Sequence, residues 1–224
     1  MKILFRKATF NLITWGCGFF VVLTSLAMLV YAGGQAFDNS SAGYQFTRNF
    51  LSDLGRLTAY SGRPNTASAI LFNTALGLAG VALVLFFLSF PRFFAHSRLF
   101  RLLSISGSLL GVLAGVCFAG ISFTPADVAR PAHIQFVMWA FRLFPLAVLV
   151  YIPALFLHPA YPRRYAWLFV LFWLLLAGYY LLLTNGPSIE TSQGFVIQVI
   201  GQKVIAYASV VSVGLQAYGA RKQA

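Results

Sequence analysis

The hydrophobic pattern of the chain consists of six long apolar stretches separated by polar connections. A helix needs about 20 apolar residues to cross a bilayer, and each stretch reaches about that length. The predicted spans are residues 9–33, 66–90, 102–124, 133–157, 165–185 and 194–218. Only the first connection, 34–65, is long, so the later neighbours are predicted to be antiparallel. The pattern predicts an all-α integral membrane protein, a six-transmembrane-helix bundle forming a single domain over residues 1–224.

The composition agrees with a lipid environment. The chain is 59% hydrophobic and 9% charged, whereas soluble domains carry about 25% charged residues. Its net charge of +12 does not indicate nucleic acid, because the bases lie between the apolar stretches and not on one soluble module. The apolar stretch 9–33 is longer than the roughly 7–15 residues of a signal-peptide core, so a retained helix is predicted. Cys17 and Cys117 provide no disulfide framework.

The distribution of basic residues predicts the orientation. With the N-terminus in the cytoplasm, the cytoplasmic segments carry ten bases and the outer connections carry four, which agrees with the positive-inside rule. An even number of spans places both termini inside. All four acids then lie outside: Asp38, Asp53, Asp127 and Glu190. We therefore expect a multi-pass protein of a bacterial or archaeal plasma membrane, with membrane lipids as its partners.

The connection 34–65 has a periodic pattern of its own. Its apolar residues recur at three- and four-residue spacing: Phe46, Phe50, Leu54 and Leu57. This spacing predicts a short amphipathic helix lying at the outer interface. Asn49 and Asp53 would flank its apolar face and point toward the bundle. The alternative is that Asp53 is a solvated loop acid or a local cap.

Two short motifs resemble the signature of a known family. They are Asn49-x-x-Ser52-Asp53-Leu54-Gly55 and Asn65-x-x-Ser68-x-x-Leu71-Phe72-Asn73. Together with Asp127 followed by His133, they resemble the six-helix membrane family named domain of unknown function 998. A more distant similarity is to the DRAM-like six-helix proteins, which carry a similar Ser-Asp-x-Gly motif after the first span. The resemblance implies a six-helix bundle and supplies no reaction.

Arg142 and Lys203 lie inside apolar stretches that contain no acid. A charge in hydrocarbon is costly unless it has a partner, so an intramembrane base indicates first a functional site. Each base lies nine residues from the outer start of its span, which is a depth of about 13 Å at 1.5 Å per residue. The two bases are therefore predicted at similar depth in the outer half of the bilayer.

Other polar residues in the same half suggest an outward-facing pocket. Arg142 and Lys203 would neutralise an anionic lipid headgroup or another small anion, since arginine offers a bidentate fork and lysine a point charge. The further predicted ligand-binding residues are Gln135, Gln198, Gln202 and Asn73, with Asp53, Asp127 and His133 at the mouth. Three alternatives stay open: snorkelling of both bases to headgroups or water, pairing with an acid of the outer connections, and a proton or ion pathway.

Catalysis is an alternative function. A membrane-embedded hydrolase or transferase acting on a lipid or glycan at the outer face would use Asp53, Asp127 and His133 as its acid–base group. Ser52 is a conceivable nucleophile. No metal or cofactor is predicted, because the sequence has no His-x-x-x-His or Cys-x-x-Cys spacing and no phosphate-binding glycine-rich loop. The balance favours a protein that is not an enzyme, and a structural membrane scaffold is a further alternative.

Two patterns concern helix packing. Gly107, Gly111 and Gly115 form a stripe of small residues at a spacing of four, which favours close approach of another helix. Pro145 follows Arg142 by three residues and lacks an N–H, so a bend or a freed carbonyl acceptor is expected beside the base.

Overall fold

The part of the chain that the structure describes has six long helices, with one short 3-10 turn in the first connection and another after the second helix. The structure, a computed structural model, describes residues 7–94, 97–159 and 161–223. The six helices are long and apolar enough to cross a membrane, which confirms that count of the sequence analysis. The elements are α1 (Lys7–Leu29), η2 (Leu51–Gly55), α2 (Thr66–Ser89), η3 (Phe90–Phe94), α3 (Arg98–Ser122), α4 (Arg130–Leu157), α5 (Arg163–Asn185) and α6 (Ser192–Gln223).

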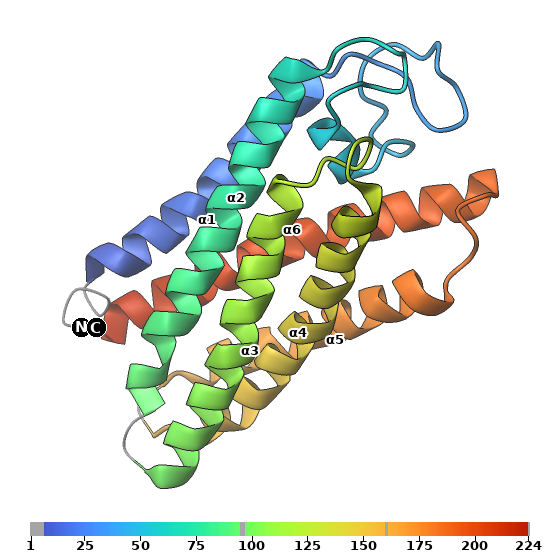
Figure 1. Cartoon of the computed structure of the whole chain (residues 1–224). Coiled ribbons are helices and arrows are strands. Elements are labelled where there is room, and N and C mark those ends of the chain that lie inside the picture. Colours follow the sequence, from blue (N-terminus) through green and yellow to red (C-terminus); the bar gives the residue numbers. More distant parts are fainter. Residues whose placement is uncertain (1–6, 95–96, 160, 224) are drawn as a thin grey trace.

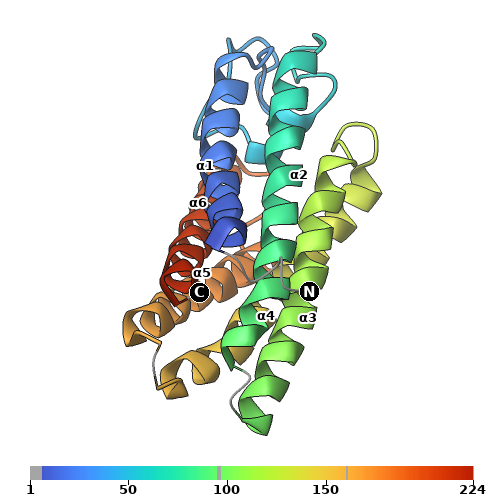
Figure 2. The ribbon, with the colours of Figure 1, turned by 90° about the vertical axis from the view of Figure 1, so that its left-hand side faces the viewer.

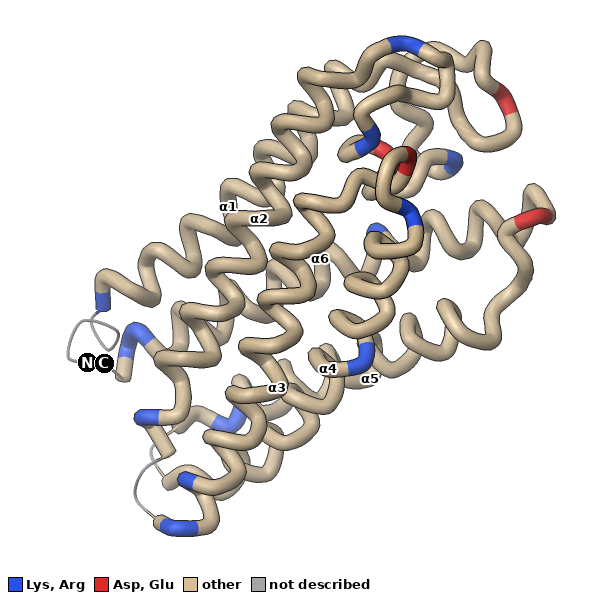
Figure 3. Tube along the Cα trace, in the orientation of Figure 1, with Lys and Arg blue, Asp and Glu red and all other residues tan. Residues whose placement is uncertain are grey.

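The helices pack in chain order and close into a ring. Each helix packs against the next one, and α6 returns to α1 and touches α2 (Figures 1 and 2). Residues 30–65, here called the cap, cover the end of the bundle at which α1 ends and α2 begins (Figure 1). This end is the cap end, and the opposite one, where α1 begins and α6 finishes, is the terminal end. All four acids lie in connections at the cap end, whereas bases lie at both ends (Figure 3).

The first connection differs from its prediction. In place of an amphipathic helix it has only the 3-10 turn η2, and the rest is irregular. Asp53 accepts from the N–H of Phe50, which in a helix from Tyr44 would bond to the carbonyl of Phe46, and this local cap makes η2 begin only at Leu51. Such local side-chain bonds compete with helix formation. The prediction of an amphipathic helix was therefore wrong, although Leu54 of its apolar face is fully buried.

The glycine stripe of α3 serves packing inside the bundle. A Cβ atom at Gly111 would overlap the ring of Phe87 on α2, and one at Gly107 would lie 2.8 Å from the ring of Tyr151 on α4. The small residues thus let α3 approach both neighbours closely, as expected for such stripes. On α4 itself, the helix continues through Pro145 and Pro153 to its end at Leu157.

Candidate functional site

Lys203 of α6 is the base that the structure buries. Its side chain is only 3% exposed, and its ammonium donates a hydrogen bond to the backbone carbonyl of Asn49 in the cap. The ammonium nitrogen also lies 5.3 Å from the ring centroid of Tyr44 and 5.1 Å from that of Phe46, at distances typical of cation–π contacts. The Tyr44 hydroxyl donates to the same carbonyl at 3.1 Å. Lys203 therefore joins α6 to the cap.

Asp53 lies beside this contact and is also buried, at 3% exposure. One carboxylate oxygen accepts from the N–H of Phe50 at 2.8 Å and from the side-chain amide of Asn49 at 3.2 Å. Burial raises the pKa of the carboxyl from 3.8 to about 6, and the Asn49 amide and the charges of Arg56 and Lys203 limit that rise. Asn49 thus lies between the base and the acid, with its carbonyl on Lys203 and its amide on Asp53.

Gln202 of α6 and the remaining residues of the two motifs complete the attachment of the cap. Gln202 accepts from the N–H of Leu51 at 2.6 Å and donates to Ser52 at 3.5 Å. Asn65 donates to the carbonyls of Leu54 and Arg56 and accepts from the N–H of Ala32. Ser68 and Asn73 of α2 donate to the carbonyls of Leu54 and Gly55 at 3.1 and 3.5 Å. The residues on which the family resemblance rests therefore hold the cap to α2 and α6.

Gly55 shows how closely the cap approaches α2. A Cβ atom there would lie 2.6 Å from the side-chain oxygen of Asn73 and 2.7 Å from the ring of Phe72. Real Cβ contacts are longer, so a glycine is required for this approach. The motif glycine has a packing role.

Three more predicted ligand-binding residues bond within the chain. The Asp127 carboxylate accepts from the N–H groups of Leu57 and Thr58 at 3.2 and 2.8 Å. His133 Nδ1 lies 2.8 Å from the carbonyl of Thr124, and because a carbonyl can only accept, Nδ1 carries the proton. Gln198 donates to the carbonyl of Leu182 at 2.8 Å. Each of these side chains supports a connection at the cap end.

The three residues of the enzyme hypothesis are not joined by hydrogen bonds. Within the described residues, no hydrogen bond links any two of Asp53, Asp127 and His133. Among all residues that the structure describes, no group of three His, Cys, Asp or Glu side chains could hold a metal ion.

Arg142 has a different environment from Lys203. It is exposed on the surface of α4, and its guanidinium lies 5.3 Å from the ring centroid of Trp139, which is also exposed. Gln135, about one turn before Trp139, is exposed too. These three residues, here called the α4 stripe, lie on one helix face at spacings of four and three. The structure therefore does not bring Arg142 and Lys203 to one pocket.

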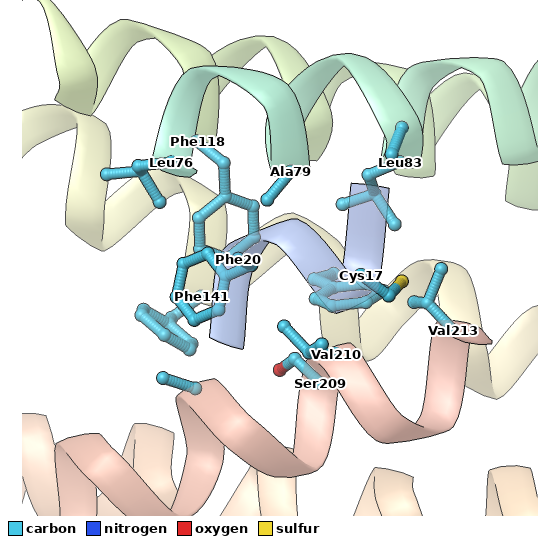
Figure 4. A pocket seen from close by; sticks show the side chains of 13 residues that line it. Cys17, Phe20, Leu76, Ala79, Leu83, Phe118, Phe141, Ser209, Val210 and Val213 are labelled. Atoms are coloured by element: carbon cyan, nitrogen blue, oxygen red, sulfur yellow. The ribbon is translucent and has the colours of Figure 1, made fainter. Parts of the chain in front are cut away.

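An apolar cavity of about 90 Å³ lies inside the ring of helices (Figure 4). Five of the six helices supply its lining, which includes Cys17, Phe20, Leu76, Phe141 and Val210. Its serine, Ser209, donates to the carbonyl of Ile205. None of the predicted ligand-binding residues lines this space, so it is not the polar pocket that the sequence suggested.

A shallow hollow lies on the surface at the start of α4. Its lining consists of Arg130, Pro131, Ala132, Ile134 and Gln135. Gln135 thus belongs both to this hollow and to the α4 stripe, which runs from it toward the middle of the helix. Sequence reasoning did not single out Trp139 for this surface, although its spacing of four from Gln135 and three from Arg142 carries the signal.

Comparison of the chain with protein-family models, with curated proteins and with solved structures gives no match, so the resemblance to the six-helix family stays a prediction from the sequence motifs.

Proposed function

We propose that this chain is a multi-pass membrane protein that binds an anionic phospholipid along the α4 stripe, with its cap on the outer face. Large apolar side chains cover the outside of the bundle, and Leu12, Ile70 and Leu109 are each more than half exposed. Such a surface suits lipid and not water. The excess of basic residues at the terminal end of the bundle supports placing the cap outside.

The exposed guanidinium of Arg142 is the observation on which the proposal rests. Arg142 lies twelve residues after Arg130, which is about 18 Å along α4 at 1.5 Å per residue. Side chains on a helix lean toward its N-terminus, which for α4 is the cap end. Its contact with Trp139, three residues nearer that end, agrees with this direction. An exposed charge at this depth needs an anion from outside the chain, because no acid lies within α4.

A phospholipid supplies that anion in the required position. Its phosphate accepts hydrogen bonds from guanidinium and amide donors, which Arg142 and Gln135 carry on one face of α4, and Arg130 adds a base to the hollow nearer the cap. Its acyl chains would continue along the apolar surface below the stripe, where Leu146 and Leu149 are exposed. Lys203 is not part of this site, because its ammonium already bonds to the cap.

Lipid retention tests the proposal. The purified full-length protein is expected to retain phosphatidylglycerol, and Arg142→Gln is expected to weaken that binding about tenfold, since a hydrogen bond to a charged group is worth about 1.5–3 kcal/mol. Arg63→Gln is the matched control, because it removes an exposed base of the cap away from the stripe. Native mass spectrometry measures the bound lipid. Equal retention by wild type and Arg142→Gln would overturn the proposal.

A further inference from the structure

A second surface hollow lies at the terminal end, between the start of α5 and the last turns of α6. Its lining consists of Arg164, Tyr165, Leu168, Leu215, Tyr218 and Lys222. Figure 2 shows these two helix ends side by side, in agreement with their contacts. We call this site the terminal hollow. It lies at the opposite end of the bundle from the start of α4.

The walls of the terminal hollow are held in place by buried contacts. The side-chain amide of Gln216 donates to the backbone carbonyl of Tyr165 at 2.7 Å, and Gln216 is fully buried. A Cβ atom at Gly219 would overlap the Tyr165 ring, so a larger residue there would force this ring or the helices to shift. The two helix ends therefore keep a defined separation, and the hollow between them is preorganised.

Two bases face the terminal hollow from opposite helices. Arg164 and Lys222 are both exposed. The Arg164 guanidinium lies 5.1 Å from the ring centroid of Tyr165, and the Lys222 ammonium nitrogen lies 4.5 Å from that of Tyr218. Arg163 and Arg221 adjoin them in the chain. Every Asp and Glu lies in a connection at the cap end (Figure 3), so no acidic side chain of the described residues lies beside these bases.

The lower part of the terminal hollow is apolar. Leu215 is 46% exposed, and Leu168 is half-buried on the α5 side. Both leucines lie nearer the middle of the bundle than the bases. Leu168 comes four residues after Arg164, and Leu215 comes seven residues before Lys222. A charged rim above an apolar floor matches an amphipathic ligand. A free soluble anion would leave the leucines uncovered.

We propose that the terminal hollow binds an anionic phospholipid of the cytoplasmic leaflet. The lipid phosphate lies between Arg164 and Lys222, and the first part of an acyl chain lies on Leu168 and Leu215. The Tyr218 hydroxyl, at the level of the bases, is a further donor to the phosphate oxygens. Basic pockets between membrane helices on the cytoplasmic side are suited to such headgroups. This site is independent of the α4 stripe, since it uses other helices and the other end of the bundle.

The test compares two variants that lose the same charge at the same end. Arg164→Gln combined with Lys222→Gln removes the rim of the terminal hollow, and Arg98→Gln combined with Arg101→Gln removes two exposed bases of α3. Each full-length protein is placed in phosphatidylcholine nanodiscs with increasing phosphatidylglycerol, and native mass spectrometry measures the bound phosphatidylglycerol. We expect the hollow variant to lose one bound phosphatidylglycerol, with at least about tenfold weaker binding at that site, and the α3 variant to change by less than about twofold.

Two results would overturn the proposal. Equal loss in both double variants would show that diffuse charge, and not the hollow, attracts the lipid. Full displacement of phosphatidylglycerol by millimolar inorganic phosphate would show that the hollow takes a soluble anion. Arg164→Gln and Lys222→Gln as single variants repeat the test if the double variant fails to fold. Adding Arg142→Gln to the hollow variant separates the two sites, because two independent sites give additive losses of bound phosphatidylglycerol.

Discussion

Replacing Asp53 by asparagine is expected to remove a pH dependence from the stability of the protein. The wild-type carboxyl is buried, and its pKa in the folded chain is raised from 3.8 to about 6. Between these values the folded state holds a proton that the unfolded state has lost. Stability is therefore highest below pH 3.8, falls as the pH rises, and levels off above about 6. This direction is opposite to that of a carboxylate stabilised by an ion pair.

The size of the effect follows from the difference between the two pKa values. Each pKa unit corresponds to about 1.4 kcal/mol, so the rise of the Asp53 pKa corresponds to about 3 kcal/mol. For a chain of this length, 1 kcal/mol moves the melting temperature by about 2–4 °C, which gives a fall on the order of 6–12 °C. The amide that replaces the carboxyl in Asp53→Asn has no charge to bury, and its oxygen can still accept from the N–H of Phe50.

The assay is thermal unfolding of the full-length protein in detergent, followed by tryptophan fluorescence from pH 4 to pH 7.5. The difference between wild type and Asp53→Asn isolates this group from other titrating residues. Asp38→Asn is the control, because Asp38 is an exposed acid of the same connection whose pKa is lowered by hydrogen bonds from Ser40. Identical profiles for wild type and Asp53→Asn would refute the reasoning, as would a wild-type stability that rises from pH 4 to pH 6.

Two further predictions use the same preparation. Lys203→Met is expected to extend the fall in stability to higher pH, because the Lys203 charge lowers the pKa of Asp53 and its loss lets that pKa rise. A fall in stability over the same pH range as in the wild type would contradict this effect of Lys203 on Asp53. Gly111→Ala is expected to cost about 1–3 kcal/mol by overpacking against Phe87. Gly178→Ala, with no atom within 4 Å of the new Cβ, is expected to gain about 0.5–1 kcal/mol from helix propensity. Equal melting temperatures for the two alanine variants would contradict the packing role of the stripe.

The helices could be predicted from the sequence because apolar length is a local property. The residues at which the helices end were harder to predict. The first span was predicted to residue 33, but α1 ends at Leu29, and Gly33 and Gly34 adopt positive φ angles of 96° and 82° in the cap. A backbone with positive φ cannot continue a right-handed helix. The hydropathy of this segment does not distinguish the end of the span from the start of the cap.

The motif residues were recognised as a pattern, but their role was not. Asn49 and Asp53 were expected at the edge of an amphipathic helix, whereas the structure uses them, with Asn65, to hold the cap together, and the Asn49 carbonyl joins it to Lys203. Two of them bond to distant backbone groups, as Asn49 does to the carbonyl of Gly34 and Asn65 to that of Leu54. A helical spacing in the same segment was misleading, since side-chain bonds to the backbone replaced the helix.

The sequence by itself determined six apolar helices, their order and the presence of two bases inside them. It could not separate Arg142 from Lys203, which lie at the same distance from the start of their predicted spans. The tertiary structure separates them, because rotation of each helix about its axis decides whether a side chain meets protein or the surroundings of the bundle. Lys203 turns inward to a carbonyl 154 residues away in the chain, whereas Arg142 turns outward beside Trp139. The chain itself therefore satisfies Lys203, whereas it offers Arg142 no acid within α4.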